Sequence, residues 1–130
     1  MSKKNGRRLT PLEALIMDAV WEMPQATVRQ VKEQLEPVKP MAYNTVLTMM
    51  RILRDKGFLA AERKGRVDVY RAVVTREQAA GRSLREVLDR FFAGSATALV
   101  SQLLAHGDLS PEEVQGIRRE VDRKLRDSSK

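Results

Sequence analysis

Apolar residues recur at helical spacing through most of the chain, and the most informative segment is 42–56, AYNTVLTMMRILRDK. Val46, Met49, Met50 and Leu53 follow one another three and four residues apart. Because such positions fall on one side of a 3.6-residue turn, the spacing predicts a helix with a single buried stripe.

The opposite side of this predicted helix is polar in an unusual way. It carries Asn44, Thr48 and Arg51, with Tyr43 and Thr45 near its start. A solvated face more often carries Glu and Lys, whereas Asn can form two hydrogen bonds with adenine and Thr offers both a hydroxyl and a methyl group to a base edge. We interpret the segment as a DNA-recognition helix, although taken alone it also fits a plain surface helix.

Two further helices are predicted upstream. The first begins at Thr10, which stands three residues before Glu13 as in a capping box, with a proline at the first helical position. We expect Pro24 to end it. The second begins after Thr27, which has the same capping spacing to Gln30. A helix, a short helix, a turn and a third helix in this order are typical of a helix-turn-helix unit.

The apolar period changes after Gly57, which we expect in the left-handed position that commonly follows a helix. Residues 58–63 and 67–74 are typical of two strands, joined by the tight basic turn Lys64-Gly65-Arg66, with Asp68 facing outward. A hairpin directly after a recognition helix is the wing of a winged-helix domain. Its basic tip is predicted to reach DNA phosphates or the minor groove.

The second half of the chain predicts three amphipathic helices, each with one apolar stripe. About 55 residues bury little core alone, so we expect the stripes to pair with a second copy; packing against the first half is the alternative. The predicted dimerisation residues are Leu84, Val87, Leu88, Phe91, Phe92, Leu99, Leu103, Val114, Ile117 and Val121.

The predicted fold class is therefore mostly α with a small β-hairpin wing. Residues 1–75 are expected to form a winged helix-turn-helix domain that binds DNA, of which residues 1–8 are a basic mobile arm. Residues 76–130 are expected to form a three-helix dimerisation domain. The length of 130 residues suits one domain of ordinary size or two small ones.

The distribution of charge strengthens the DNA interpretation. Residues 1–74 carry 14 Lys and Arg against 8 Asp and Glu, a net charge of +6, whereas residues 75–130 carry 10 against 9. The basic excess thus lies in the half that contains the predicted recognition helix, as a phosphate-binding half requires.

Several function classes are disfavoured by missing residue types. The chain has no cysteine and a single histidine, His106, so neither a nucleophile triad nor a common metal cluster can be assembled, and we expect no enzyme, cofactor or metal. An aromatic content of 5% gives no stacking platform for RNA. No apolar run approaches the ~18 residues of a membrane span, and no secretory signal is evident, so a cytoplasmic protein without membrane insertion is expected.

The sequence resembles the penicillinase-repressor family, the BlaI/MecI/CopY transcriptional regulators, over about residues 9–125. The resemblance rests on Leu9-Thr10-Pro11-Leu12-Glu13 through Trp21, on Ala42-Tyr43-Asn44-Thr45-Val46 through Leu59, and on Leu109 through Val114. It implies a repressor that binds a palindromic double-stranded DNA operator as a homodimer. The residues it places on DNA are Tyr43, Asn44, Thr45, Thr48, Arg51, Lys64 and Arg66.

The same resemblance bears on how such a repressor is released. Members that respond to β-lactams are inactivated by cleavage of an Asn-Phe bond, which makes a regulatory membrane protease a candidate partner; the matching bond here is Gln102-Leu103. Copper-responsive members carry a cysteine cluster that this chain lacks. The functional alternative is a dimeric winged-helix adaptor that binds protein, or DNA without sequence preference.

Overall fold

The computed structural model describes residues 8–129, so the expected basic arm lies outside the described residues except for Arg8. The chain forms two compact units, Met1–Arg85 and Glu86–Lys130. The boundary falls within helix α4 (Arg76–Phe92). The division into functional domains at residue 75 stays a prediction.

Three helices form most of the first unit: α1 (Pro11–Trp21), α2 (Val28–Leu35) and α3 (Tyr43–Asp55). Both predicted capping boxes are present. The side chains of Thr10 and Thr27 each accept a hydrogen bond from the backbone N–H three residues on, and their own backbone N–H groups each donate one to the side chain of that residue. The first helix ends ahead of Pro24. Gly57 follows α3 with φ +89°, the left-handed conformation expected of it.

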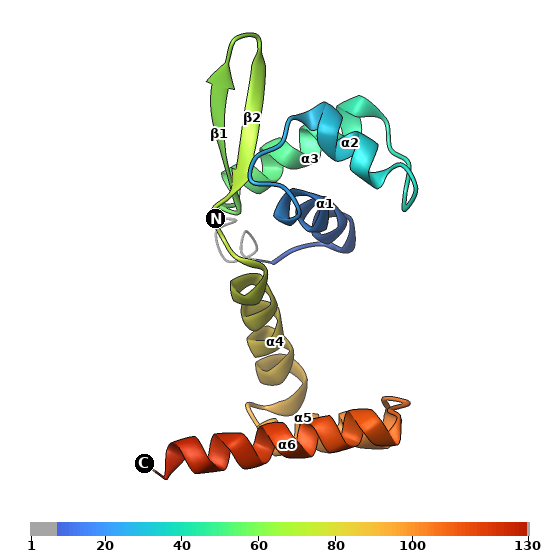
Figure 1. Ribbon diagram of the computed structural model, residues 1–130, viewed down its shortest axis with the longest axis vertical. Coiled ribbons are helices and arrows are strands. Elements are labelled where there is room, and N and C mark those ends of the chain that lie inside the picture. The colour runs from blue at the N-terminus through green and yellow to red at the C-terminus, as the bar shows by residue number, and fades with distance from the viewer. Residues whose placement is uncertain (1–7, 130) are drawn as a thin grey trace. The chain divides into compact units, whose positions relative to one another are not determined.

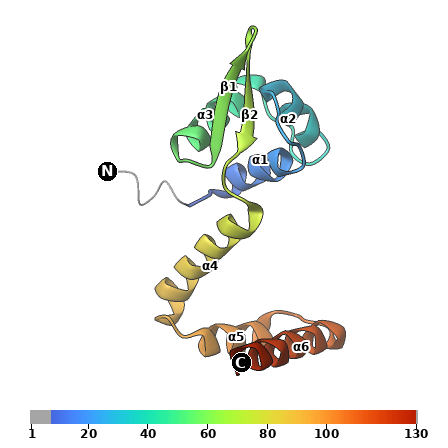
Figure 2. The same cartoon turned by 60° about the vertical axis from the view of Figure 1, so that its left-hand side comes forward.

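Strands β1 (Leu59–Lys64) and β2 (Val67–Ala72) form an antiparallel hairpin that projects beyond the three helices (Figures 1 and 2). Lys64 pairs with Val67, so Gly65 and Arg66 alone make the turn. Gly65 has φ +66°, which a residue without Cβ adopts most readily. At its base the hairpin is joined by Ala26, which exchanges two 2.8 Å backbone hydrogen bonds with Tyr70.

The facing of β2 corrects one prediction. Asp68 was expected to face outward, but it shares a side with the fully buried Tyr70 and is itself partly buried, while Val67 is 50% exposed. Alternate residues of a strand face the same side, so placing the large ring of Tyr70 in the core fixes the side on which every other residue lies.

The core of the first unit lies where α1, α3 and the base of the hairpin meet. On α3 the predicted stripe is confirmed: Val46, Met50 and Leu53 are fully buried, and Met49 is partly buried. Contributions from the other elements complete one continuous cluster of buried apolar side chains, among them Ile16, Met17, Val20, Val31, Phe58, Leu59 and Tyr70. This packing leaves the opposite face of α3 open to solvent.

The start of α4 is held on the first unit by α1. The indole Nε1 of Trp21 donates a 2.8 Å hydrogen bond to the carbonyl of Val74. The guanidinium of Arg76 lies 5.0 Å from the centroid of the Trp21 ring and forms a 2.9 Å ion pair with Asp18. Thr75 caps the helix, accepting a hydrogen bond from the backbone of Gln78.

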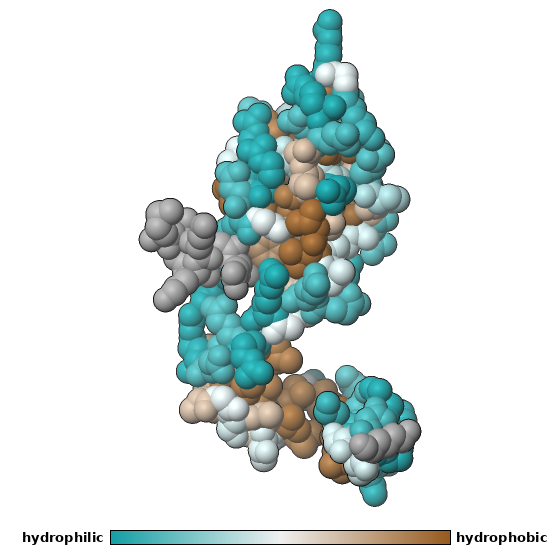
Figure 3. Space-filling view, turned by 90° about the vertical axis from the view of Figure 1, so that its left-hand side faces the viewer, coloured by the Kyte–Doolittle hydropathy of each residue, from teal (hydrophilic) through white to brown (hydrophobic). Residues whose placement is uncertain are grey.

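The second unit contains the end of α4 together with α5 (Ala96–His106) and α6 (Pro111–Ser128). Helices α5 and α6 run in opposite directions (Figures 1 and 2). None of the side chains described from 86 to 129 is buried. Figure 3 shows apolar side chains of this unit open on its surface. Among residues 8–129, no helix combines the length and apolarity that crossing a membrane requires.

Candidate nucleic-acid interface

The outer face of α3 presents three predicted DNA-binding residues in line. Asn44, Thr48 and Arg51 lie four and three residues apart, so they share one stripe along the helix, and all three are exposed. The opposite stripe is the buried one that anchors α3 in the core. The helix is therefore rigidly held by one face and offers amide, hydroxyl and guanidinium groups on the other.

A cleft of about 360 Å³ lies beside this stripe, between the start of α2, one side of α3 and the hairpin. Ten residues from these three elements line it, and four of them are arginines. The lining residues are Thr27, Val28, Arg29, Tyr43, Leu47, Arg51, Arg63, Arg66, Val67 and Asp68.

Only some of the predicted DNA-binding residues line the cleft. It brings together Tyr43 and Arg51 from α3 with Arg66 from the hairpin turn. It does not include Lys64, whose ammonium group instead donates a 3.3 Å hydrogen bond to the side chain of Gln25. Thr45 is exposed near the start of α3 and is not among the cleft residues.

The electrostatic character of the cleft is strongly positive. Its only acidic residue is Asp68, which forms a 3.4 Å ion pair with Arg63. Within residues 8–129, Arg29, Arg51 and Arg66 are exposed and form no ion pair. Three guanidinium groups are thus available to an anion, and guanidinium matches phosphate geometry with two parallel donors.

Two arginines of this surface, Arg29 and Arg63, were not among the residues predicted from the sequence. Arg63 looked like an ordinary strand residue, and its role depends on the hairpin folding back toward α2. Arg29 did carry a signal. It lies in the first turn of α2, which has no acidic residue, although the positive end of a helix favours carboxylates and disfavours cations.

The far end of α3 is fixed by a largely buried ion pair. The ammonium group of Lys56, the residue that follows the helix, lies 2.7 and 2.9 Å from the two carboxylate oxygens of Glu13 on α1. The same ammonium donates a 3.1 Å hydrogen bond to the carbonyl of Arg8. Glu13 is the one charged residue buried among the described residues, so this contact ties the end of α3 to α1.

Most of the predicted dimerisation residues present apolar surface to solvent. Phe91 is 71% exposed, Leu84 54% and Val121 51%. Leu88, Phe92, Leu99 and Ile117 are partly buried within this single chain, and Val87, Leu103 and Val114 are exposed. The bond between Gln102 and Leu103 lies inside α5, where both residues are exposed and helical.

The three-helix core, the hairpin that follows α3 and the open polar face of α3 define a winged helix-turn-helix protein. A family model described as "Penicillinase repressor" matches residues 9–123. The chain belongs to the penicillinase-repressor family, as the resemblance predicted. This is a family of transcriptional repressors, so the expectation that the chain is not an enzyme is confirmed.

Individual relatives agree with this assignment. The methicillin resistance regulatory protein MecI of Staphylococcus aureus is 20% identical over 109 residues, which cover 84% of this chain and 89% of MecI. The penicillinase repressor of Bacillus licheniformis is 25% identical over 107 residues, 82% of this chain and 84% of that protein. The solved DNA-binding domain of the repressor BlaI has the same fold, with a TM-score of 0.50 and 24% identity over 55% of this chain and 88% of that domain.

Proposed function

We propose that this repressor binds a palindromic DNA operator as a homodimer, with α3 of each copy in the major groove and the hairpin beside it. The observation that carries the proposal is the division of α3 into two faces. Val46, Met50 and Leu53 hold one face in the core, and the opposite face presents Asn44 and Thr48, whose amide and hydroxyl groups suit base edges.

The homodimer part of the proposal rests on the second unit. Helices α4 to α6 expose large apolar residues, Phe91 most of all, and the described part of this unit buries none of its own side chains. Exposed apolar surface of this extent favours association, at about 25 cal/mol for each Å² removed from water. A two-fold dimer would cover these faces symmetrically and present two copies of α3 to two half-sites.

The experiment is a titration of the full chain with duplex DNA from upstream of its own gene, alongside a scrambled duplex of equal length and composition. Specific binding is expected to exceed non-specific binding by about 10³-fold or more at physiological salt. Footprinting of the bound duplex should show two protected half-sites related by two-fold symmetry and about one helical turn apart, or a small multiple of that distance.

The outcomes separate the proposal from its alternatives. Equal, steeply salt-dependent binding to both duplexes would indicate a DNA binder without sequence preference. No binding to either duplex would favour the adaptor that binds protein. Sedimentation of the free protein tests the dimer independently of DNA, and a single-chain mass at micromolar concentration would refute it.

A further inference from the structure

We infer that the cleft between α2, α3 and the hairpin is a binding site for one phosphate group, held by Arg29 and Arg51. This deepens the proposed function and rests on it where the phosphate is that of the DNA backbone. The inference assigns Arg29 a role that the predicted recognition surface did not include. It also assigns Arg51, one of the predicted DNA-binding residues, to the DNA backbone and not to the bases.

The composition of the cleft favours an anion. Four arginines and one aspartate are among the ten residues that line its volume of about 360 Å³. The positive charge is not balanced within the described part of the chain, because Arg29 and Arg51 have no ion-pair partner there. A fold that gathers unpaired guanidinium groups at one place is stabilised when an anion occupies it.

Arg29 lies at the start of α2, where a positive charge is unfavourable. The capping box of this helix uses the side chain of Thr27 for the backbone N–H of Gln30, at 3.2 Å, so the cap does not neutralise the positive helix end. A cation in the first turn adds to that positive potential instead of opposing it. Arg29 therefore costs helix stability in the free protein, and an anion at the cleft offsets the cost.

Arg51 differs from its neighbours on the outer stripe of α3. Arg51 lines the cleft together with Tyr43, whereas Asn44 and Thr48 do not. The outer stripe of α3 thus divides into residues that face directly outward and an arginine that leans toward the hairpin side. A phosphate in the cleft would lie beside the major groove while Asn44 and Thr48 face the bases.

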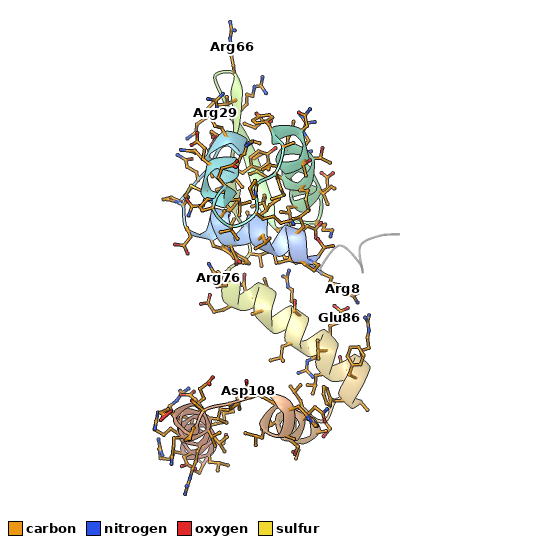
Figure 4. All side chains as sticks on the ribbon, turned by 90° about the vertical axis from the view of Figure 1, so that its right-hand side faces the viewer. Arg8, Arg29, Arg66, Arg76, Glu86 and Asp108 are labelled. Carbon is orange, nitrogen blue, oxygen red and sulfur yellow. The ribbon has the colours of Figure 1, made fainter. Side chains whose placement is uncertain are left out.

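The two arginines of the hairpin that line the cleft, Arg63 and Arg66, contribute differently. Figure 4 shows Arg66 extending from the tip away from the rest of the unit, whereas Arg29 lies at the end of α2 nearest the hairpin. Arg66 can therefore reach a neighbouring phosphate, and Arg29 stays with the cleft. Arg63 is held at 3.4 Å by Asp68, the one negative charge that would repel the bound phosphate.

The DNA arm of the test compares Arg29→Gln with Arg82→Gln. Both substitutions remove one exposed positive charge from the first unit, but Arg82 lies on α4 and does not line the cleft. Affinity for a random duplex is measured by fluorescence anisotropy between 50 and 200 mM KCl. The salt slope is the slope of the logarithm of the binding constant against the logarithm of the salt concentration. Loss of one phosphate contact lowers its magnitude by about 0.9. The ratio of the wild-type binding constant to that of Arg29→Gln should therefore fall roughly 3.5-fold between 50 and 200 mM KCl.

Arg51→Gln tests whether Arg51 contacts the DNA backbone or the bases. A residue that holds the backbone loses affinity equally on the operator and on a random duplex, whereas a base-reading residue loses more on the operator. Asp68→Asn should act in the opposite direction, raising affinity for both duplexes because it removes the repelling charge. Circular dichroism of each variant confirms that the fold is kept.

The second arm uses inorganic phosphate without DNA. Phosphate is titrated into ¹⁵N-labelled protein at constant ionic strength, with chloride as the control anion, and the backbone amide signals of residues 27–29 are followed. The site is supported if phosphate causes saturable shifts, chloride causes none, and Arg29→Gln abolishes them. This result would support the site even if the protein binds no duplex. If phosphate binds and no duplex does, the proposed function fails, and the ligand of the cleft is a free phosphate compound.

A reduced salt slope for Arg29→Gln without saturable phosphate shifts would support the site and identify its occupant as the DNA backbone. The inference is overturned if Arg29→Gln matches wild type in both arms. It is equally overturned if Arg82→Gln lowers the slope as much as Arg29→Gln does, because the effect would then be one of net charge alone.

Discussion

Replacing Lys56 with Met should destabilise the first unit far more than replacing its partner, Glu13, with Gln. Lys56→Met removes the cation that contacts the Glu13 carboxylate at 2.7 Å, and the Glu13 side chain is 5% exposed. The carboxylate then keeps one described hydrogen bond, from the backbone N–H of Thr10 at 2.9 Å. Removing one partner of a buried ion pair costs about 3–5 kcal/mol, because the other charge stays buried without compensation.

Glu13→Gln, which removes the other partner of the ion pair, should lower the free energy of unfolding less. Glutamine at position 13 can still accept the hydrogen bond from Thr10, since Glu and Gln both serve in a capping box. Lys56 is 19% exposed and ends a flexible chain, so its ammonium group can reach water. We therefore expect about 3 kcal/mol for Lys56→Met, about 1 kcal/mol for Glu13→Gln, and close to 1 kcal/mol for the double variant, which buries no charge at all.

Urea denaturation followed by the fluorescence of Trp21 measures these differences. Trp21 is the only tryptophan and lies on α1, so its signal reports the first unit without interference from the second. All variants are compared at one protein concentration, because self-association shifts apparent stability. Losses of similar size for both single variants that add in the double variant would refute the argument, since they would show no coupling between the two charges.

Three further outcomes test other parts of the structure. Tyr70→Phe should leave stability unchanged or raise it by up to about 1 kcal/mol in the same urea assay, because the Tyr70 hydroxyl is buried with no hydrogen-bond partner among the described residues; a clear loss would reveal a partner. Asn44→Ala should weaken operator binding by about 1–3 kcal/mol and leave random duplexes nearly unaffected in anisotropy titrations. Equal losses on both would remove Asn44 from the base-reading residues. Phe91→Asp should halve the mass found by sedimentation, and an unchanged mass would mean that its stripe does not hold the dimer.

The helices of this protein could be predicted from the sequence because their ends are locally encoded. Thr10, Thr27, Thr75 and Ser110 each stand three residues before a Glu or Gln, and each caps a helix in the structure. A cap depends only on the few residues beside it, so no knowledge of the rest of the fold is needed. The buried stripe of α3 was predictable for a similar reason, since four apolar residues share one side of the helix.

The facing of the hairpin could not be predicted in the same way. Residues 67–74 contain apolar side chains at both even and odd positions, so alternation alone does not choose a side. The choice is made by Tyr70, whose ring fills the core and whose backbone pairs with Ala26, a residue more than forty positions earlier. Packing against distant residues therefore decided the facing of Asp68, against the expectation from its charge.

One part of the candidate site could be predicted from the sequence and another part could not. Asn44, Thr48 and Arg51 could be placed on one face because the helix that carries them fixes their spacing. The cleft could not be found this way, because Arg29, Arg51 and Arg63 come from three elements and meet only after the hairpin returns toward α2. The one local sign was a cation at the positive end of a helix. An unfavourable charge in an exposed and easily replaced position is evidence for a compensating anion, so in this fold the electrostatic mismatch at Arg29 is more informative than the net charge of the whole chain.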